Sequence, residues 1–225
     1  MAREAARVEV AAGPVSLWRA AWIIFQKDLL LEWRTSARLN ALLFFSLATL
    51  LLFSFALGPD TKALARGAGG YLWLAVLFAS VLSLGESFRV EGENAALVGL
   101  RLAPCDARAV FLGKAINNAL LLFAIALVLM PVCIALFGVS VVEGWGPLLA
   151  ILALGCLAIA APGTLYAAIA NHARARDILL PLLLFPLLVP ALLASAKGTN
   201  LVLHGDPMDQ LGSWFGLLGA FNLVF

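Results

Sequence analysis

The residues whose types could do chemistry gather in one segment of the chain. This segment reads VEGENAALVGLRLAPCDARAVFLGK, from Val90 to Lys114, and it interrupts a sequence that is 63% hydrophobic. Acidic residues at Glu86, Glu91 and Glu93 supply the polar side of a helix predicted over residues 86–102, and leucines supply the apolar side. The sequence has no Gly-rich phosphate loop, catalytic triad or paired carboxylates, so we expect a contact surface rather than an enzyme.

The second half of the segment predicts another helix. Pro104 ends the first helix, and Asp106 is a good N-cap for a helix that continues through Lys114 into a membrane span. The loop therefore reads as two helices joined at a proline corner. Its apolar face must be covered by lipid, by the rest of the chain or by another protein.

The rest of the sequence offers few residues that could bind a metal or a cofactor. The three cysteines form no CxxC or CxxCH motif. His172 and His204 are expected in loops on opposite sides of the membrane, and neither has a second ligand at metal-binding spacing. A loop histidine can ligate haem axially, but a solvated histidine is our interpretation. We expect no metal and no directly bound cofactor.

The elements that position this segment are membrane spans. Charged residues make up 12% of the chain and the mean hydropathy is +1.01, whereas soluble domains carry about 25% charged residues. A span needs about 20 apolar residues. We expect an all-α bundle of six spans, near 39–57, 69–85, 115–137, 148–170, 178–196 and 214–225. The last is expected to be truncated at Phe225.

Basic residues orient the bundle. Lys and Arg concentrate in the N-terminal segment, the 86–114 loop and the 171–177 loop, so these are predicted to be cytoplasmic. The net charge of +2 argues against nucleic acid as a partner.

The rest of the chain supports a simple domain plan. Residues 1–14 are predicted to be a flexible N-terminus, and 15–38 an amphipathic helix at the membrane interface, with Trp18 and Trp22 toward lipid. Residues 39–225 then form one transmembrane domain. Trp73, Trp145 and Trp214 are interpreted as an aromatic belt at the span ends.

The predicted spans carry two further signals. Spans one and three to five contain no Asp, Glu, Lys, Arg or His, which weakens an ion-coupled secondary transporter. The fifth span holds Pro181, Pro186 and Pro190, which are candidate hinges of a pathway-lining helix. An ordinary bent helix explains them equally well, because membrane helices tolerate proline.

The segment from Glu86 to Lys114 resembles the cytoplasmic loop of ABC-2-type transporter permeases. This resemblance implies an ABC-2 type of bundle with a coupling helix seated on a separate ATPase subunit. The ATPase contacts that it implies are Glu86, Arg89, Glu91, Gly92, Glu93, Leu97, Pro104, Asp106, Gly113 and Lys114. A second candidate cytoplasmic contact holds His172, Arg174 and Arg176.

Within that superfamily the chain is most similar to the haem exporter protein B (CcmB) family of cytochrome c maturation. The similarity rests on YLWLAVLFASVLSLGESF at 71–88, on the loop that follows it, on FSFALGP at 53–59, on the Pro-rich fifth span and on GLLGAF at 216–221. It runs from about residue 17 to the end and is specific over 71–114.

The resemblance implies partners and a location. They are a cytoplasmic ATPase like CcmA that binds ATP, a haem-handling membrane protein like CcmC, a periplasmic haem chaperone, and the bilayer of a bacterial inner membrane, with the N-terminus cytoplasmic. Haem would be handled by this complex, homodimeric or heteromeric. The implied function is haem export or ATP-driven release of the haem-loaded chaperone. An exporter of lipid, drug or polysaccharide and a non-transporting scaffold are the alternatives.

Overall fold

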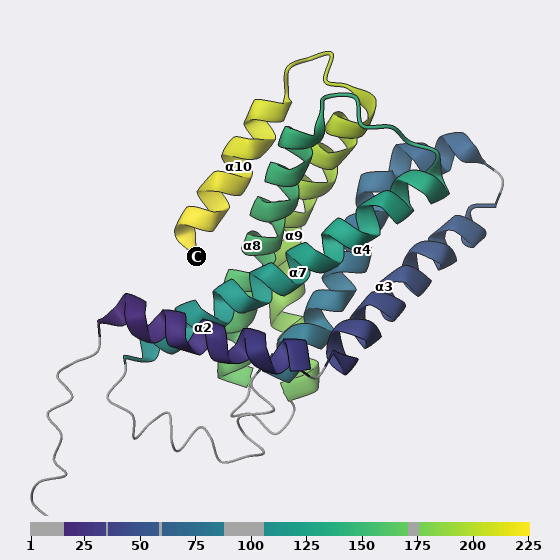
Figure 1. Ribbon diagram of the computed structural model, residues 1–225. Coiled ribbons are helices and arrows are strands. Elements are labelled where there is room, and N and C mark those ends of the chain that lie inside the picture. The colour runs from purple at the N-terminus through teal and green to yellow at the C-terminus, as the bar shows by residue number, and fades with distance from the viewer. Residues whose placement is uncertain (1–15, 35, 59, 88–105, 171–175) are drawn as a thin grey trace, which may run out of the picture.

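The described part of the protein is entirely helical. The computed structural model describes residues 16–34, 36–58, 60–87, 106–170 and 176–225, with only the backbone described over 176–179. The predicted flexible N-terminus lies outside these ranges. The helices are α2 (Leu17–Arg34), α3 (Ala37–Ala56), α4 (Thr61–Ser87), α7 (Ala107–Phe137), α8 (Trp145–Ala170), α9 (Arg176–His204) and α10 (Leu211–Val224). Figure 1 shows α2 crossing one end of a bundle formed by the others.

Five of the six predicted spans correspond to helices that are long and apolar enough to cross a membrane. They are α3, α4, α7, α8 and α9, with mean hydropathies of 1.7 to 3.0 in their most apolar windows. The chain is therefore a multi-pass membrane protein. At the sixth position α10 has 14 residues, which is shorter than those five.

The helices extend beyond the apolar runs that predicted them. The second span was expected at 69–85, but α4 covers Thr61–Ser87; the fifth was expected at 178–196, but α9 reaches His204. Hydropathy marks only the part of a helix that suits lipid, whereas caps and turns determine where its backbone hydrogen bonding ends. His204 consequently lies in the last turn of α9, and not in a loop as predicted.

The predicted start of α7 is confirmed. Asp106 is its N-cap, with extended backbone angles, and its side chain accepts a hydrogen bond of 2.9 Å from the amide of Arg108. Such a cap satisfies one of the free amides at a helix start. At the other end Gly138 adopts a left-handed conformation that ends the helix.

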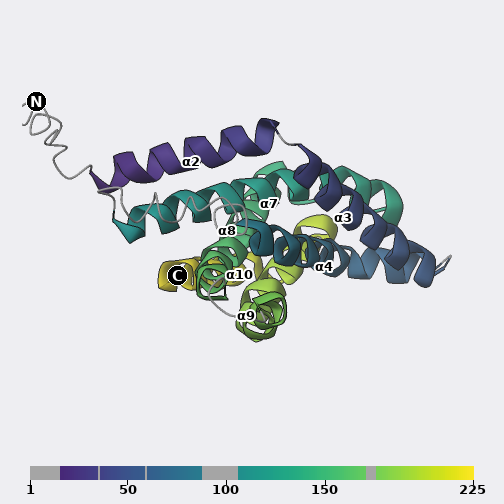
Figure 2. The same cartoon turned by 90° about the horizontal axis from the view of Figure 1, so that it is seen from below.

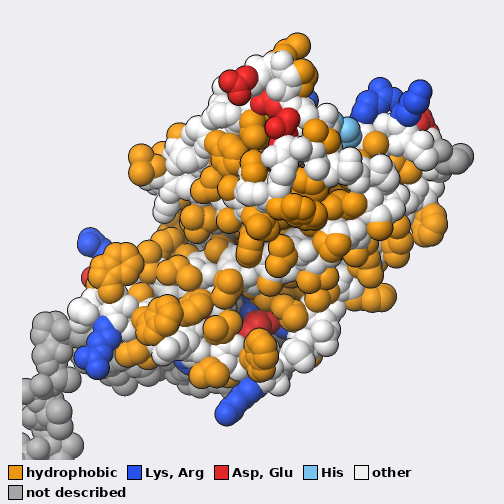
Figure 3. Space-filling view, turned by 45° about the horizontal axis from the view of Figure 1, so that its top comes forward, with side chains coloured by type: hydrophobic (Ala, Val, Ile, Leu, Met, Phe, Trp, Pro, Cys, Tyr) orange, Lys and Arg blue, Asp and Glu red, His pale blue; other side chains and the backbone are white. Residues whose placement is uncertain are grey.

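The core lies where α4, α7, α8 and α9 pack against one another. The helix α3 packs on α4 and α7 at one edge, and α10 packs on α8 and α9 at the other. Between these edges hydrophobic side chains cover much of the outer surface, and charged side chains lie mainly near the two ends of the bundle (Figure 3). This distribution suits a bundle surrounded by lipid.

Trp73 corrects the sequence-based prediction of an aromatic belt. Its side chain is only 1% exposed, and its indole Nε1 donates a hydrogen bond of 2.9 Å to Oγ1 of Thr199. Burial of an indole requires such a partner. Trp73 therefore joins α4 to α9 inside the core instead of marking a lipid headgroup region.

The same helix pair approaches closely at Gly69. The amide of Gly69 donates a 2.9 Å hydrogen bond to the Asn200 side-chain oxygen. A Cβ added at Gly69 would lie 2.7 Å from the carbonyl oxygen of Ala196, whereas one added at Gly70 would meet nothing within 4 Å. Only the first glycine is needed for the contact between α4 and α9.

A matched pair of substitutions tests this contact. We expect Gly69→Ala to destabilise the detergent-solubilised protein by about 1–3 kcal/mol, because backbone must move to admit the methyl group. Gly70→Ala in the same helix is expected to be neutral or stabilising by up to about 1 kcal/mol. Thermal unfolding followed by size-exclusion chromatography measures both, and equal midpoints for the two variants would contradict the close approach.

Candidate functional site

The helix α2 is fixed to the bundle by small residues. Ala20 and Ala21 form a buried cluster with Ala109 of α7. A Cβ added at Gly113 would lie 2.7 Å from the carbonyl oxygen of Ala21 and 2.9 Å from Cβ of Ile24. Since these contacts advance in the same direction along both helices, α2 and α7 run parallel. Figure 2 shows the two helices side by side.

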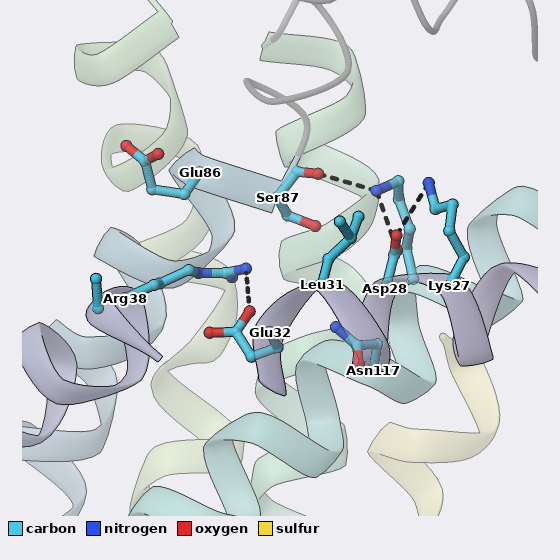
Figure 4. Close-up of a pocket in the computed structure, with 10 residues that line it drawn as sticks. Lys27, Asp28, Leu31, Glu32, Arg38, Glu86, Ser87 and Asn117 are labelled. Atoms are coloured by element: carbon cyan, nitrogen blue, oxygen red, sulfur yellow. Dashed lines mark hydrogen bonds and ion pairs between the residues drawn. The ribbon is translucent and has the colours of Figure 1, made fainter. Parts of the chain in front are cut away.

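An ion pair continues this contact by one turn. Nζ of Lys114 lies 3.2 Å from a carboxylate oxygen of Asp28, with the lysine 2% and the aspartate 9% exposed. The same Nζ donates a 2.9 Å hydrogen bond to the carbonyl oxygen of Ser87, at the end of α4. Lys27 approaches the other oxygen of Asp28 at 3.0 Å. Lys114 therefore joins α2, α4 and α7 at one point (Figure 4).

A second cation ties α2 and α3 to α4. Arg38, at the start of α3, lies 2.9 Å from a carboxylate oxygen of Glu32 in α2. Its other terminal nitrogen donates to the Ser83 carbonyl oxygen at 2.8 Å and to the Ser83 hydroxyl at 2.7 Å. Charge-assisted bonds of this kind are stronger than neutral ones.

The polar contacts continue into the bundle. The side-chain amide of Asn118 donates to Oγ1 of Thr164 in α8 at 3.0 Å and to Oγ of Ser87 at 3.3 Å. Asn118 is 1% exposed, so these bonds form in a region without bulk water. The α2 end of the bundle is thus held by hydrogen bonds and ion pairs from α2, α3, α4, α7 and α8.

A cavity of about 340 Å³ opens among these groups. Its lining residues are Lys27, Asp28, Leu31, Glu32, Ala37, Arg38, Glu86, Ser87, Lys114 and Asn117. Figure 4 shows Glu86 directed away from the pairs of Asp28 and Glu32, and the Asn117 amide directed between those two acids. We call this set of residues the junction cavity.

The residues predicted from the sequence fall into three groups. Glu86 lines the junction cavity, Asp106 caps α7, and Gly113 and Lys114 are buried against α2. The backbone of Arg176 begins α9. The other predicted contacts lie outside the described residues: Arg89, Glu91, Gly92, Glu93, Leu97, Pro104, His172 and Arg174.

The three candidate hinge prolines all lie inside α9. Pro181 is partly exposed. Pro186 and Pro190 are exposed, so these two point away from the core of this chain. The helix continues through all three.

Sequence reasoning missed the chemistry of α2. It assigned that helix an aromatic face, and Trp18 and Trp22 are indeed 73% and 57% exposed. The opposite face, with Ala20, Ile24 and Asp28 at steps of four, packs on α7. The sequence did contain a signal for this contact: Asp28 follows Ala20 and Ile24 at helical spacing, which places an acid on an otherwise small and apolar face.

The junction can hold helices together and accept a polar ligand. Among the described residues no group of three His, Cys, Asp or Glu side chains could hold a metal ion. The charges of the junction are arranged in opposite pairs with hydrogen-bonded partners, as is usual for buried ions that stabilise a structure.

Comparison with known proteins places residues 19–225 in one family. The family model described as CcmB protein matches residues 19–225. A "Heme exporter protein B" from Haemophilus influenzae is 30% identical over 205 residues, covering 89% of this chain and 91% of the relative. Proteins of that name from Rhodobacter capsulatus (33% over 184 residues, 77% and 79%) and Pseudomonas aeruginosa (30% over 203 residues, 90% of each) are also similar.

The buried ion pair can be tested by a double-mutant cycle. We expect Lys114→Met alone to destabilise the protein by about 3–5 kcal/mol, because Asp28 then loses its principal buried partner. The double variant Asp28→Leu/Lys114→Met is expected to recover most of that loss, since no unpaired buried charge remains. Thermal unfolding in detergent provides the measurement.

Lys62→Met is the control for this cycle, because Lys62 is exposed at the other end of the bundle. It is expected to change stability by less than about 0.5 kcal/mol. A purely additive cycle would show that Asp28 and Lys114 do not interact.

Proposed function

The chain belongs to the CcmB protein family, and we propose that it is the membrane permease subunit of an ATP-driven haem exporter. In this proposal a separate cytoplasmic ATPase binds the segment between α4 and α7. ATP hydrolysis there drives either haem export or the release of a haem-loaded periplasmic chaperone. The proposed location is a bacterial inner membrane with α2 on the cytoplasmic side, in a complex that includes a haem-handling membrane protein.

The observation that carries the proposal is the way both ends of that segment are held. Ser87 is the last described residue before the segment, and its carbonyl oxygen accepts a hydrogen bond from Lys114. Asp106 is the first described residue after the segment, and it caps α7. Lys114 is in turn paired with Asp28 of α2. A displacement of the segment must therefore move α2, α4 and α7 together. Force applied by a partner would reach the whole bundle through this junction.

The chain itself supports the role of a driven subunit. Its sequence has no phosphate-binding loop, so ATP must bind elsewhere. A partner can shift the permease between two states only by the difference in its affinity for them. The segment between α4 and α7 follows and precedes helices that Lys114 joins to α2, and in this proposal it offers a partner such a differential contact.

In this proposal the chain moves haem or its chaperone, and a long-lived haem site belongs to the haem-handling membrane protein. His204, a candidate axial ligand, is engaged at 3.0 Å by the Asn200 carbonyl oxygen within its own helix. For this contact to be a hydrogen bond, Nδ1 of His204 must carry the proton, because a carbonyl oxygen only accepts. In the neutral ring Nε2 then remains as an acceptor. That nitrogen has the arrangement of a possible metal ligand, but among the described residues no group of three His, Cys, Asp or Glu side chains that could hold a metal ion forms around it.

Co-purification with the neighbouring ATPase tests the proposal. We expect the wild-type chain to retain the ATPase in detergent and Glu91→Lys/Glu93→Lys to lose at least nine-tenths of it, because reversed charges oppose a basic partner surface. Cytochrome c maturation in a strain that lacks the native protein should fall in parallel.

The control is Lys62→Glu/Arg66→Glu, which reverses two exposed charges at the opposite end of the bundle and should leave ATPase binding intact. If the 91/93 variant folds and still retains the ATPase, the contact lies elsewhere. If the wild type binds no ATPase at all, a non-transporting scaffold becomes the better explanation. Normal cytochrome c maturation without the protein would indicate an exporter of another substrate.

A further inference from the structure

The junction cavity contains polar groups that the protein itself does not satisfy. Oε1 of Glu32 and Nε of Arg38 are buried without a hydrogen-bond partner. The Asn117 side chain, only 6% exposed, makes no hydrogen bond with the residues that the structure describes and points into the cavity (Figure 4). Each such group costs stability unless a ligand or ordered water completes it.

These groups define what a ligand must offer. Glu32 presents a carboxylate oxygen, which accepts hydrogen bonds, while Nε of Arg38 donates one. The ligand therefore needs an N–H donor and an anionic acceptor close together. The Asn117 amide can serve either group.

The charges around the cavity favour a ligand with no net charge. Among the described residues of the lining, three cations, Lys27, Arg38 and Lys114, are matched in number by three acids, Asp28, Glu32 and Glu86. Because these charges balance, a ligand with a single net charge would enter without compensation. A zwitterion carries both charges, so each charge finds an opposite partner in the lining.

The position of the cavity indicates that the ligand comes from the bilayer. The cavity lies at the ends of the candidate spans α3, α4 and α7, beside α2. Leu31 and Ala37 are the apolar residues of its described lining. Other apolar side chains of α2 and α3 are exposed: Leu30, Trp33, Phe44 and Phe45. Acyl chains could follow that surface while a headgroup occupies the polar space.

We propose that the junction cavity binds the headgroup of a zwitterionic phospholipid that carries a primary ammonium and a phosphate, as phosphatidylethanolamine does. The ammonium donates to Glu32, and the phosphate accepts from Arg38 and Asn117. The volume of about 340 Å³ suits a small headgroup. A choline headgroup lacks N–H donors and leaves Glu32 unsatisfied, so the site discriminates between the two zwitterions.

Lipid-dependent stability of the delipidated full-length protein tests the proposal. We expect phosphatidylethanolamine to raise the unfolding midpoint by about 5 °C at saturation. Phosphatidylcholine and phosphatidylglycerol with the same acyl chains should raise it by less than half as much. Soluble glycerophosphoethanolamine, at the same concentration, should have little effect because it lacks the chains.

Two variants locate the effect. Glu32→Gln and Asn117→Ser should each abolish most of the preference for ethanolamine, and Asn117→Ser does so without touching an ion pair. Asp209→Asn is the matched control, since it neutralises an exposed acid in the distant loop between α9 and α10 and asparagine tolerates the φ of 52° found there. It should keep the full preference. Mass spectrometry of the purified protein should show ethanolamine lipid retained by wild type and control and depleted in both cavity variants.

The result can contradict the proposal in three ways. Equal stabilisation by choline and ethanolamine lipids would show that Glu32 does not read the ammonium group. A preference for phosphatidylglycerol would show that the cavity selects an anion. Stabilisation by glycerophosphoethanolamine equal to that by the lipid would assign the site to a free soluble ligand instead of the membrane.

Discussion

The arrangement at the α2 end of the bundle depends on one buried cation. Lys114 is 2% exposed, and its amino group contacts both the carboxylate of Asp28 and the backbone of Ser87. A charge so far from water is tolerated only when its partners are in place. The positions of α2, of the end of α4 and of the start of α7 are consequently coupled to one another. The small residues along α2 and α7 bring the helices close enough for that coupling.

Composition was sufficient to predict much of this architecture. The apolar runs identified five helices long enough to span a membrane, and Asp106 was correctly predicted as the cap of α7. These predictions succeed because lipid and free backbone amides impose strong local requirements. Family membership was also readable, since the segment from Tyr71 onward is distinctive.

Long-range pairings were not predictable from the single sequence. Asp28 and Lys114 are 86 residues apart. Lys114 was interpreted as an ATPase contact, and nothing in its own segment singled out Asp28. Trp73 was misread for the same reason: its partner Thr199 comes 126 residues later. Periodicity shows which face of a helix is apolar, but not which other helix covers it. The polar residues of the site depend on which helix covers them, so periodicity alone could not identify them.

The parallel contact between α2 and α7 also bears on how the chain is made. The helix α2 leaves the ribosome early, but the residues that cover its small-residue face and neutralise Asp28 are synthesised only with α7. Among the described residues this face of α2 packs mainly on α7, so it lacks that cover until α7 is made. Synthesis of the first turns of α7 therefore supplies the contacts that fix the N-terminal helix in place. A nascent chain interrupted before that point would expose Asp28 without its buried partner Lys114 and would leave the alanines of α2 uncovered, a feature that membrane quality control could recognise.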